Sequence, residues 1–387
     1  MESTLIKNML ILHFKGEVNS SNIVALEEEV NAAIEGKEFT YLILNFADVT
    51  YISSVGLRLI LKLKQKYDKV AVAETSLEVY DVFRMTGFTN IMDISKKLAV
   101  ISVDGCQVIG DGFFSTVYRL NKDTIVKVFK DTSDLGTIQQ ELNLAKQAFV
   151  LGIPTAISYD VVRVGDRLGV RFEMLDSVSL RDLFRDNPKR YDELVGKYAA
   201  LLKKINTTES MSNDLRDARG MWFEKADACK PYLTEAEYEK LHKMLSDIEV
   251  RGTFVHGDCH VKNIMSQGDE LFLIDMETLC KGHPIYELGK IHSTYIAFSE
   301  DDPGNGARFL GLDDDFIVKM FHDTLDVYFG GKCDEDTWNK ISIISYTHMV
   351  WWAFNYASDD KKEKMIHGNA ERLKKLIARY DDLEIAA

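Results

Sequence analysis

The first hundred residues alternate between short apolar runs and longer segments with helical spacing. Residues 9–13, 40–45 and 70–73 are short apolar runs with strand-forming residues, and they predict β-strands. Three further segments repeat apolar residues every three to four positions and predict amphipathic helices: 22–34, 55–67 and 77–85. Ser20 and Ser21 lie where the first of these helices would need an N-cap. Strands that alternate with helices imply one sheet with helices packed on it, and hence an α/β domain over residues 1–98.

A different pattern begins at residue 99. Residues 106–109 predict a strand, and residues 110–118 (GDGFFSTVY) predict a turn that leads into a second strand. Residues 124–129 predict a third strand, and residues 138–149 predict a helix. The remaining predicted elements are a strand at 271–274 and helices at 316–329, 338–351 and 369–380. The sequence therefore predicts two domains, with the second over residues 99–387.

Composition narrows the class of protein. The chain has 387 residues, 46% of them hydrophobic and 28% charged, as expected for globular protein with two or three domains. Its net charge of −14 disfavours nucleic acid and anionic membranes as partners, because both repel an acidic surface. No apolar run approaches the ~20 residues that span a bilayer, and the N-terminal segment lacks a signal-peptide cleavage site. The five cysteines form no CxxC pair, which argues against a zinc site or disulfide framework and indicates a reducing, cytoplasmic compartment.

A turn with two adjacent serines leads into the predicted helix near residue 54. ADVTYISSVGLRLIL (47–61) and SLEVYDVFRMTGFTNIMDI (76–94) resemble the STAS domain of bacterial anti-sigma-factor antagonists, over residues 5–96. In that family a serine at this turn is phosphorylated, and the phosphate decides whether a regulatory partner protein binds. The resemblance places this phosphosite at Ser54, whereas Ser53 stands where the family usually has aspartate. A helix N-terminus favours a phosphate, and the alternative is a serine that only caps the helix.

The second domain contains features suited to nucleotide phosphates. Gly110 and Gly112 lie in the predicted turn with Ser115 shortly after, and glycine lets a backbone approach phosphate closely. Lys127 alternates with apolar neighbours in the following strand, so it points to one face of the sheet, where it needs an anion. Glu141 on the predicted helix is an acid suited to pair with this lysine. The alternatives are a plain hairpin turn, a surface lysine and a solvated helix face.

The segment HGDCHVKNIM, which starts at His256, carries the most specific chemical signal. Phosphoryl transfer needs a carboxylate to receive the hydroxyl proton and oxygen ligands to hold Mg²⁺ on the nucleotide. Asp258 and Asn263 lie on one predicted loop, and Asp275 ends the hairpin that follows. We therefore expect Asp258 and Asp275 to lie close together. The alternative is that His256 and His260 cap turns and that the acids are solvated.

Together these segments resemble the aminoglycoside phosphotransferase and choline kinase superfamily, and not the eukaryotic protein kinases, over residues 99–295. HGD stands in place of HRD, IDME stands in place of DFG, and no APE follows. GHPIYEL, from Gly282, matches the family stretch GxPxxDL with glutamate for aspartate, and FEML, from Phe172, resembles the hinge that contacts adenine. The resemblance implies a bilobal, protein-kinase-like α+β domain with an N-lobe over 99–175 and a C-lobe over 176–387.

The same resemblance implies ATP and Mg²⁺ as cofactors and a role for each residue. Asp258 would be the catalytic base, and Asn263 and Asp275 would ligate Mg²⁺. His256 and Glu287 would support the catalytic loop. Lys127, oriented by Glu141, would bind the α/β-phosphates of ATP. The residues implied to contact ATP are Gly110, Gly112, Ser115, Lys127, Glu141, Glu173 and Leu175.

The acceptor implied by this resemblance is a small-molecule hydroxyl compound, such as an aminoglycoside, an amino alcohol or a sugar. Aromatic residues at 351–356 would suit a cationic or sugar substrate, although this spacing is more often core. Acidic residues at 300–302 and 313–315 would attract an amine, although solvated loops have the same composition. Two other functions stay open: a protein-serine kinase acting on its own or a related STAS domain, and a nucleotide-sensing pseudokinase.

Overall fold

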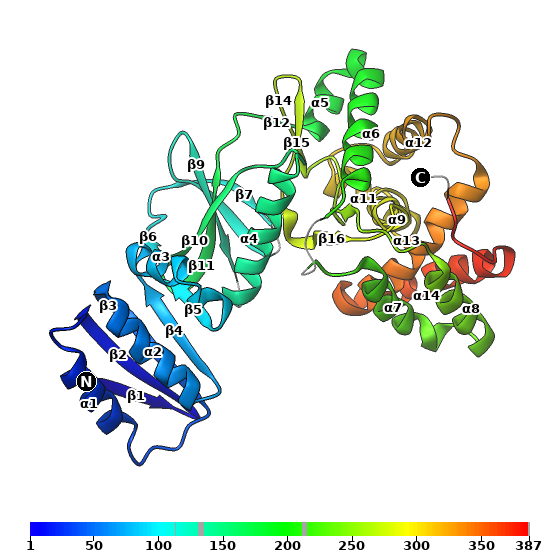
Figure 1. Ribbon diagram of the computed structural model, residues 1–387. Helices are drawn as coiled ribbons and strands as arrows, with labels where there is room; N and C mark the ends of the chain where they lie inside the picture. Colours follow the sequence, from blue (N-terminus) through cyan, green and yellow to red (C-terminus); the bar gives the residue numbers. More distant parts are fainter. Residues whose placement is uncertain (113, 131–134, 211–214, 386–387) are drawn as a thin grey trace. The chain divides into compact units, whose positions relative to one another are not determined.

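The computed structural model describes residues 1–112, 114–130, 135–210 and 215–385 (Figure 1). The chain groups into two compact units, one of Met1–Ser102 with Val162–Asp166 and one of Val103–Val161 with Arg167–Ala387. Strand β6 (Ala99–Ile101) pairs in parallel with Val162–Val164 inside the first unit. The predicted boundary after residue 98 therefore stays a prediction.

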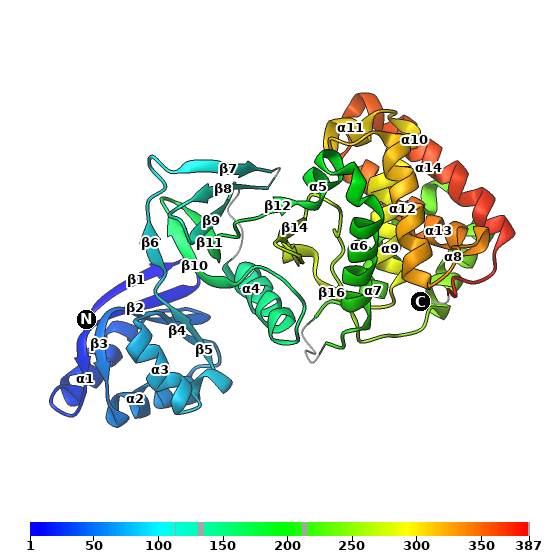
Figure 2. The ribbon, with the colours of Figure 1, turned by 90° about the horizontal axis from the view of Figure 1, so that it is seen from above.

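The first unit is a five-stranded sheet in which the strand order follows the chain. Its strands are β1 (Glu2–Ile6), β2 (Met9–Val18), β3 (Tyr41–Ile52), β4 (Val70–Thr75) and β5 (Asp93–Lys96). β1 and β2 form an antiparallel hairpin, and the later neighbours pair in parallel. Parallel neighbours need crossover connections, which α1 (Ile23–Ile34), α2 (Ser54–Lys66) and α3 (Leu77–Met85) supply (Figure 2). The predicted α/β class is confirmed.

The N-terminal part of the second unit is an antiparallel sheet with one helix. Strands β7 (Gln107–Asp111), β8 (Ser115–Arg119), β9 (Thr124–Phe129), β10 (Ser158–Val164) and β11 (Arg167–Glu173) take the order β10-β11-β9-β8-β7, and the last three residues of β10 belong to the first unit. Helix α4 (Leu135–Val150) separates β9 from β10 in the chain. Lys127 lies on β9 opposite Val117 on one side and Val170 on the other. A strand paired on both sides fixes the face toward which this lysine points.

The remainder of the second unit is mainly helical. Its helices are α5 (Leu180–Asp186), α6 (Tyr191–Thr207), α7 (Ala218–Cys229), α8 (Glu235–Asp247), α9 (Ile285–His292), α10 (Phe298–Asp301), α11 (Asn305–Phe309), α12 (Asp314–Phe329), α13 (Glu335–Tyr356) and α14 (Asp359–Arg379). α13 packs against α7, α9 and α14, and every residue from Ile341 to Val350 is buried, as in a helix enclosed on all sides. This confirms the predicted kinase-like α+β class.

Two small sheets carry the segments with the chemical signal. One joins β12 (Val178–Ser179), β14 (Ile264–Gln267) and β15 (Glu270–Leu273), and the other joins β13 (Phe254–Val255) and β16 (Cys280–Lys281). The loop between β13 and β14 and the turn after β15 are therefore held beside each other. Among the described residues, no helix is both long enough and apolar enough to cross a membrane.

Candidate active site

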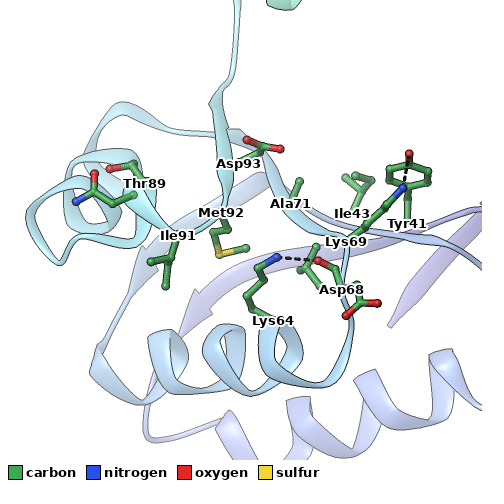
Figure 3. A pocket seen from close by; sticks show the side chains of 12 residues that line it. Tyr41, Ile43, Lys64, Asp68, Lys69, Ala71, Thr89, Ile91, Met92 and Asp93 are labelled. Carbon is green, nitrogen blue, oxygen red and sulfur yellow. Dashed lines mark hydrogen bonds between the residues drawn. The ribbon is translucent and has the colours of Figure 1, made fainter. Parts of the chain in front are cut away.

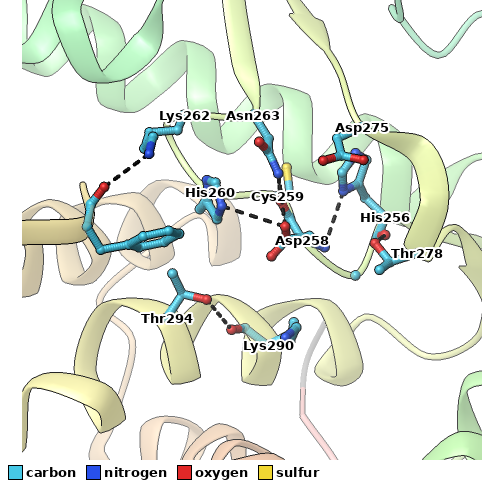
Figure 4. Close-up of polar contacts among 12 residues, drawn as sticks. His256, Asp258, Cys259, His260, Lys262, Asn263, Asp275, Thr278, Lys290 and Thr294 are labelled. Atoms are coloured by element: carbon cyan, nitrogen blue, oxygen red, sulfur yellow. Dashed lines mark hydrogen bonds and ion pairs between the residues drawn. The ribbon is translucent and has the colours of Figure 1, made fainter. Parts of the chain in front are cut away.

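Asp258 and Asn263 lie together on the loop between β13 and β14, as predicted (Figure 4). The side-chain amide of Asn263 donates from Nδ2 to Oδ2 and to the backbone carbonyl of Asp258, both at 3.0 Å. The amide nitrogen thus faces Asp258, and the amide oxygen is turned away from it. The side chain of Asp258 is 33% exposed, so it is partly open to solvent.

His256 joins the two acidic segments. Its Nδ1 accepts the backbone N–H of Asp258 at 3.2 Å, and its Nε2 lies 3.1 Å from the carbonyl of Ile274, the residue before Asp275. A carbonyl only accepts hydrogen bonds, so Nε2 carries the proton and Nδ1 is free to accept. Burial lowers the pKa of His256, against the opposing effect of the nearby aspartates, and keeps the imidazole in this neutral form.

Asp275 follows β15 in a left-handed backbone conformation, with φ 64° and ψ 65°. Such values are uncommon for residues other than glycine and cluster at functional sites. Oδ1 of Asp275 accepts a hydrogen bond from Nζ of Lys127 at 2.9 Å, and Glu277 also pairs with this lysine. The side chain of Lys127 is only 14% exposed. Burial disfavours its charge, but Asp275 and Glu277 outweigh burial and raise the pKa of Lys127, so it stays charged.

Glu287 contacts the backbone of the loop between β13 and β14. It lies fully buried in the first turn of α9, and its carboxylate accepts the backbone N–H groups of His256 and, at 3.1 Å, of Gly257. Burial raises the pKa of Glu287 to about 7, although the backbone N–H groups favour its charged form. Gly257 has φ 79°, and a Cβ there would lie 3.1 Å from the carbonyl oxygen of Thr278. Only glycine fits this turn without strain.

Four of the residues predicted to bind the nucleotide lie on the β7–β8 hairpin and on α4. Gly110 and Gly112 lie at the β7–β8 turn, where a Cβ would come no closer than 3.6 and 3.5 Å to other atoms. The fold itself therefore does not require glycine at these positions, and close approach of a ligand would be a reason for it. Ser115 is buried at the start of β8. Glu141 lies on α4, but its side chain is outside the part that the structure describes, so its predicted pairing with Lys127 stays a prediction.

The predicted hinge, residues 172–175, begins in the last two residues of β11. The carboxylate of Glu173 accepts the backbone N–H of Ile157 at 2.8 Å, and the carbonyl of Leu175 accepts the hydroxyl of Ser177 at 3.2 Å. The side chain of Glu173 is thus used within the protein.

Three residues near the loop were missed by sequence reasoning. Tyr198 donates its hydroxyl to the carbonyl of Cys259 at 2.7 Å, and the hydroxyl of Tyr295 accepts the backbone N–H of Val261 at 2.9 Å. Tyr295 lies in a π-helical turn, Ser293–Ala297, a feature found frequently at functional sites. Neither tyrosine has a local sequence signal. Glu277 had one, since it follows Asp275 by two residues on the same turn.

The donor set suits Mg²⁺. Oδ1 of Asn263 and the second carboxylate oxygen of Asp275 are hard oxygen donors, of the kind that Mg²⁺ prefers. Among the described residues, no group of three or more His, Cys, Asp or Glu side chains is placed to hold a metal ion. Mg²⁺ is usually bound by one or two protein groups together with phosphates and water, so two protein ligands are sufficient.

Ser54 lies in the first unit as the exposed first residue of α2. Ser53 occupies the N-cap position and makes no side-chain capping bond. The helix approaches the sheet closely at Gly56, where a Cβ would lie 2.7 Å from Val18 and 2.8 Å from Ile52. Glycine at this position therefore allows the N-terminal end of α2, where Ser54 lies, to approach the sheet this closely.

A cavity of about 470 Å³ also opens on the first unit (Figure 3). Its amino groups already have partners: Lys64 donates to the carbonyl of Asp68 at 2.8 Å, and Lys69 donates to the hydroxyl of Tyr41 at 3.0 Å. None of the predicted site residues lines this cavity. We assign no ligand to it.

Comparison with known proteins identifies both parts of the chain. A model of the phosphotransferase enzyme family (APH) matches residues 105–315, and the STAS domain model matches residues 1–100. BtrV of Bordetella bronchiseptica, assigned as an anti-sigma factor antagonist, is 34% identical over 96 residues, which are 24% of this chain and 82% of that protein.

Two solved structures are also similar to this chain. A choline/ethanolamine kinase family protein from Mesorhizobium loti has a TM-score of 0.47 and 13% identity, over 70% of this chain and 87% of that one. The streptomycin–ATP complex of APH(2")-IIa has a TM-score of 0.44 and 16% identity, over 68% of this chain and 89% of that one.

Proposed function

Since the chain belongs to the phosphotransferase enzyme family and carries an N-terminal STAS domain, we propose that it transfers the γ-phosphoryl group of Mg²⁺-bound ATP to the hydroxyl group of a small molecule. The observation that carries this proposal is the arrangement around Asp258. The carboxylate of Asp258 has one oxygen held by the amide of Asn263. His256 joins this loop to the segment of Asp275, and Asp275 pairs with the charged Lys127 of β9.

Asp258 acts as the base. Because Asn263 holds Oδ2, the carboxylate keeps one orientation and Oδ1 is left for the acceptor hydroxyl. As the acceptor oxygen bonds to the γ-phosphorus and the bond from phosphorus to ADP breaks, the hydroxyl proton passes to Asp258. Neutral His256 keeps the loop in place, because its Nδ1 accepts the N–H of Asp258 itself.

The other residues position the nucleotide. Lys127, charged in the structure, binds the α/β-phosphates, and Glu141 orients it. The β7–β8 hairpin, which carries Gly110, Gly112 and Ser115, borders the phosphates. Mg²⁺ held by Asn263 and Asp275 would neutralise phosphate charge.

The test is ADP release by the purified protein with Mg²⁺-ATP and a panel of hydroxyl compounds, followed by mass spectrometry of the products. A phosphorylated small molecule is expected, and it should be absent with Asp258→Asn. Nucleotide binding without turnover of any acceptor would instead favour the nucleotide-sensing pseudokinase.

The STAS domain is proposed to bind a regulatory protein through the end of α2 that carries Ser54. This proposal is supported by the exposure of Ser54 and by the relative assigned as an anti-sigma factor antagonist. All five cysteines are free thiols, which agrees with the cytoplasm as the proposed compartment.

A further inference from the structure

A cluster of basic groups lies beside the catalytic loop, on three helices that pack together. It comprises Lys225 on α7, Lys290 on α9 and His348 on α13, and α13 contacts both other helices. Nζ of Lys290 lies 2.8 Å from Nε2 of His348. We call these three residues the basic cluster.

The basic cluster is close to the catalytic base. Lys290 is less than one helical turn beyond Glu287, which holds the backbone of Gly257. Figure 4 shows Lys290 on α9 across from Asp258. Burial lowers the pKa of Lys290, and the negative charges of Asp258 and Glu287 oppose that lowering.

The amino groups of the cluster form no direct ion pair within the described part of the protein. In the described ranges, no carboxylate lies within 4.0 Å of Nζ of Lys225 or Lys290. Lys225 is only 7% exposed, and its Nζ lies over the indole rings of Trp222 at 3.7 Å and Trp351 at 5.4 Å. Burial, together with repulsion from Lys290, lowers the pKa of Lys225 to about 7. Buried lysines are almost always paired, and an anion beside Lys225 would favour its charged form.

His348 provides a second, independent sign of a ligand. Nε2 of His348 accepts from the Lys290 ammonium, which has donors only, so the proton of the neutral imidazole is on Nδ1. Burial keeps the pKa of His348 well below its usual value, so the ring is neutral. Nδ1 is buried without a hydrogen-bond partner in the described part of the chain, and His348 is only 2% exposed. An unpaired buried N–H donor needs an acceptor atom.

Several of the features that would suit a cationic acceptor are used within the protein. Trp351 faces the ammonium of Lys225. Asp314 accepts the backbone N–H groups of Gly304 and Gly306. The acids at 300–302 pair with internal bases: Glu300 and Asp301 with Arg372, and Asp302 with Arg308 and Lys361.

We propose that the acceptor carries an acidic group, such as a carboxylate, which binds among Lys225, Lys290 and His348 and places the hydroxyl at Asp258. This proposal rests on the proposed phosphotransferase function and names the chemical class of its substrate. The ammonium groups donate to the acid, and the N–H of His348 donates to it as well. A cationic acceptor is repelled by the same groups.

The first experiment uses acceptors that differ only in charge. ADP release and product mass are measured with glycerate, glycerol and 3-aminopropane-1,2-diol, and with gluconate, glucose and glucosamine. In at least one set the acid is expected to be phosphorylated faster than its neutral and amine counterparts. Phosphorylation of an amine or a neutral compound in preference to its acid would overturn the acidic-acceptor proposal and leave the phosphotransferase function intact.

The second experiment detects binding without turnover. The thermal midpoint of the protein is followed as glycerate or gluconate replaces chloride at constant ionic strength. We expect a rise that survives Lys127→Met, which removes the proposed phosphate contact, and Lys375→Met, a control on an exposed lysine of α14. Lys225→Met and Lys290→Met should each weaken the apparent affinity about tenfold or more, since a charged hydrogen bond is lost.

The two experiments separate the two claims. A midpoint that responds equally in Lys225→Met, Lys290→Met and the wild type would overturn the anion site. If either variant does not fold, the thermal midpoint of the Lys127→Met protein is compared between the acids and their neutral and amine counterparts. That comparison then decides whether the protein has an anion site. A response confined to the acids without any turnover would support the anion site and contradict the phosphotransferase function.

Discussion

The carboxylate of Glu287 accepts the backbone N–H of Gly257 at 3.1 Å, from a position 30 residues further along the chain. This bond connects the first turn of α9 to the residue before Asp258. Because Glu287 is fully buried, the geometry of the catalytic loop depends on a group whose charge changes near neutral pH. Two predictions come from this pair.

The first concerns pH and stability. The pKa of Glu287 is raised in the folded state to about 7, from 4.5. Its contribution to stability is therefore fully present below pH 4.5 and is lost as pH rises through 7, by roughly 3 kcal/mol in total. In Glu287→Gln this loss should be absent. Urea unfolding at several pH values between 4.5 and 8 would measure the difference in slope.

Glu270→Gln is the matched control, because Glu270 is exposed on β15. Its pH profile should parallel that of the wild type. Parallel profiles for Glu287→Gln and the wild type would contradict the role of Glu287 as the titrating group.

The second concerns the close approach at Gly257. Gly257→Ala would place a Cβ 3.1 Å from the carbonyl of Thr278 at a φ of 79°, and should lower the free energy of unfolding by about 1–3 kcal/mol. It should also displace Asp258 and lower turnover by up to ~10²-fold, because a small misplacement of the base is costly. Gly268→Ala has a similar φ, 61°, with no atom within 4 Å of the added Cβ. Gly268→Ala should have similar backbone strain but keep its turnover. An equal loss of turnover in both variants would contradict the role given to the close approach at Gly257.

The third prediction concerns Asp275. Asp275→Asn keeps a residue type that tolerates the left-handed conformation but removes the charge from one Mg²⁺ ligand. Affinity for an ATP analogue in the presence of Mg²⁺ should fall about tenfold or more. Titration calorimetry with and without Mg²⁺ gives the measurement. If the increase in affinity on adding Mg²⁺ were unchanged, Asp275 would not be a ligand.

Much of the fold was predictable from local patterns, and the errors have physical reasons. Leu77–Met85 was predicted with its observed bounds, because a Ser76 side chain caps an amphipathic helix there. Ser20 and Ser21 do not cap α1: Asn22 occupies the N-cap position, and Ser21 donates to Asn19. β1 was missed, because its exposed edge lacks a clear apolar pattern.

The candidate site was likewise predictable only where its residues are close together in the sequence. Asp258 and Asn263 were predicted to meet because they share one loop, and the structure brings them within 3.0 Å. The basic cluster could not be predicted, since its members lie on three helices and are brought together only by packing around α13. Spacing along the chain carries no signal for such a contact.

Ser54 provides the fourth test, which separates the proposed function from a protein-serine kinase. After incubation with Mg²⁺-ATP, intact-protein mass spectrometry should show no stoichiometric phosphate on Ser54. The small-molecule acceptor takes the phosphoryl group in our account. Phosphate on Ser54 of the wild type, absent in Asp258→Asn, would instead show that the kinase domain acts on its own STAS domain.

The most direct test of the account is the turnover of Asp258→Asn with the best acceptor from the charge-matched panel. Asparagine at position 258 cannot accept the hydroxyl proton, so turnover should fall roughly 10²-fold or more. Affinity for an ATP analogue should stay close to that of the wild type, because Lys127 and Asp275 remain paired. A variant that kept more than about a tenth of the wild-type turnover would contradict the assignment of Asp258 as the base.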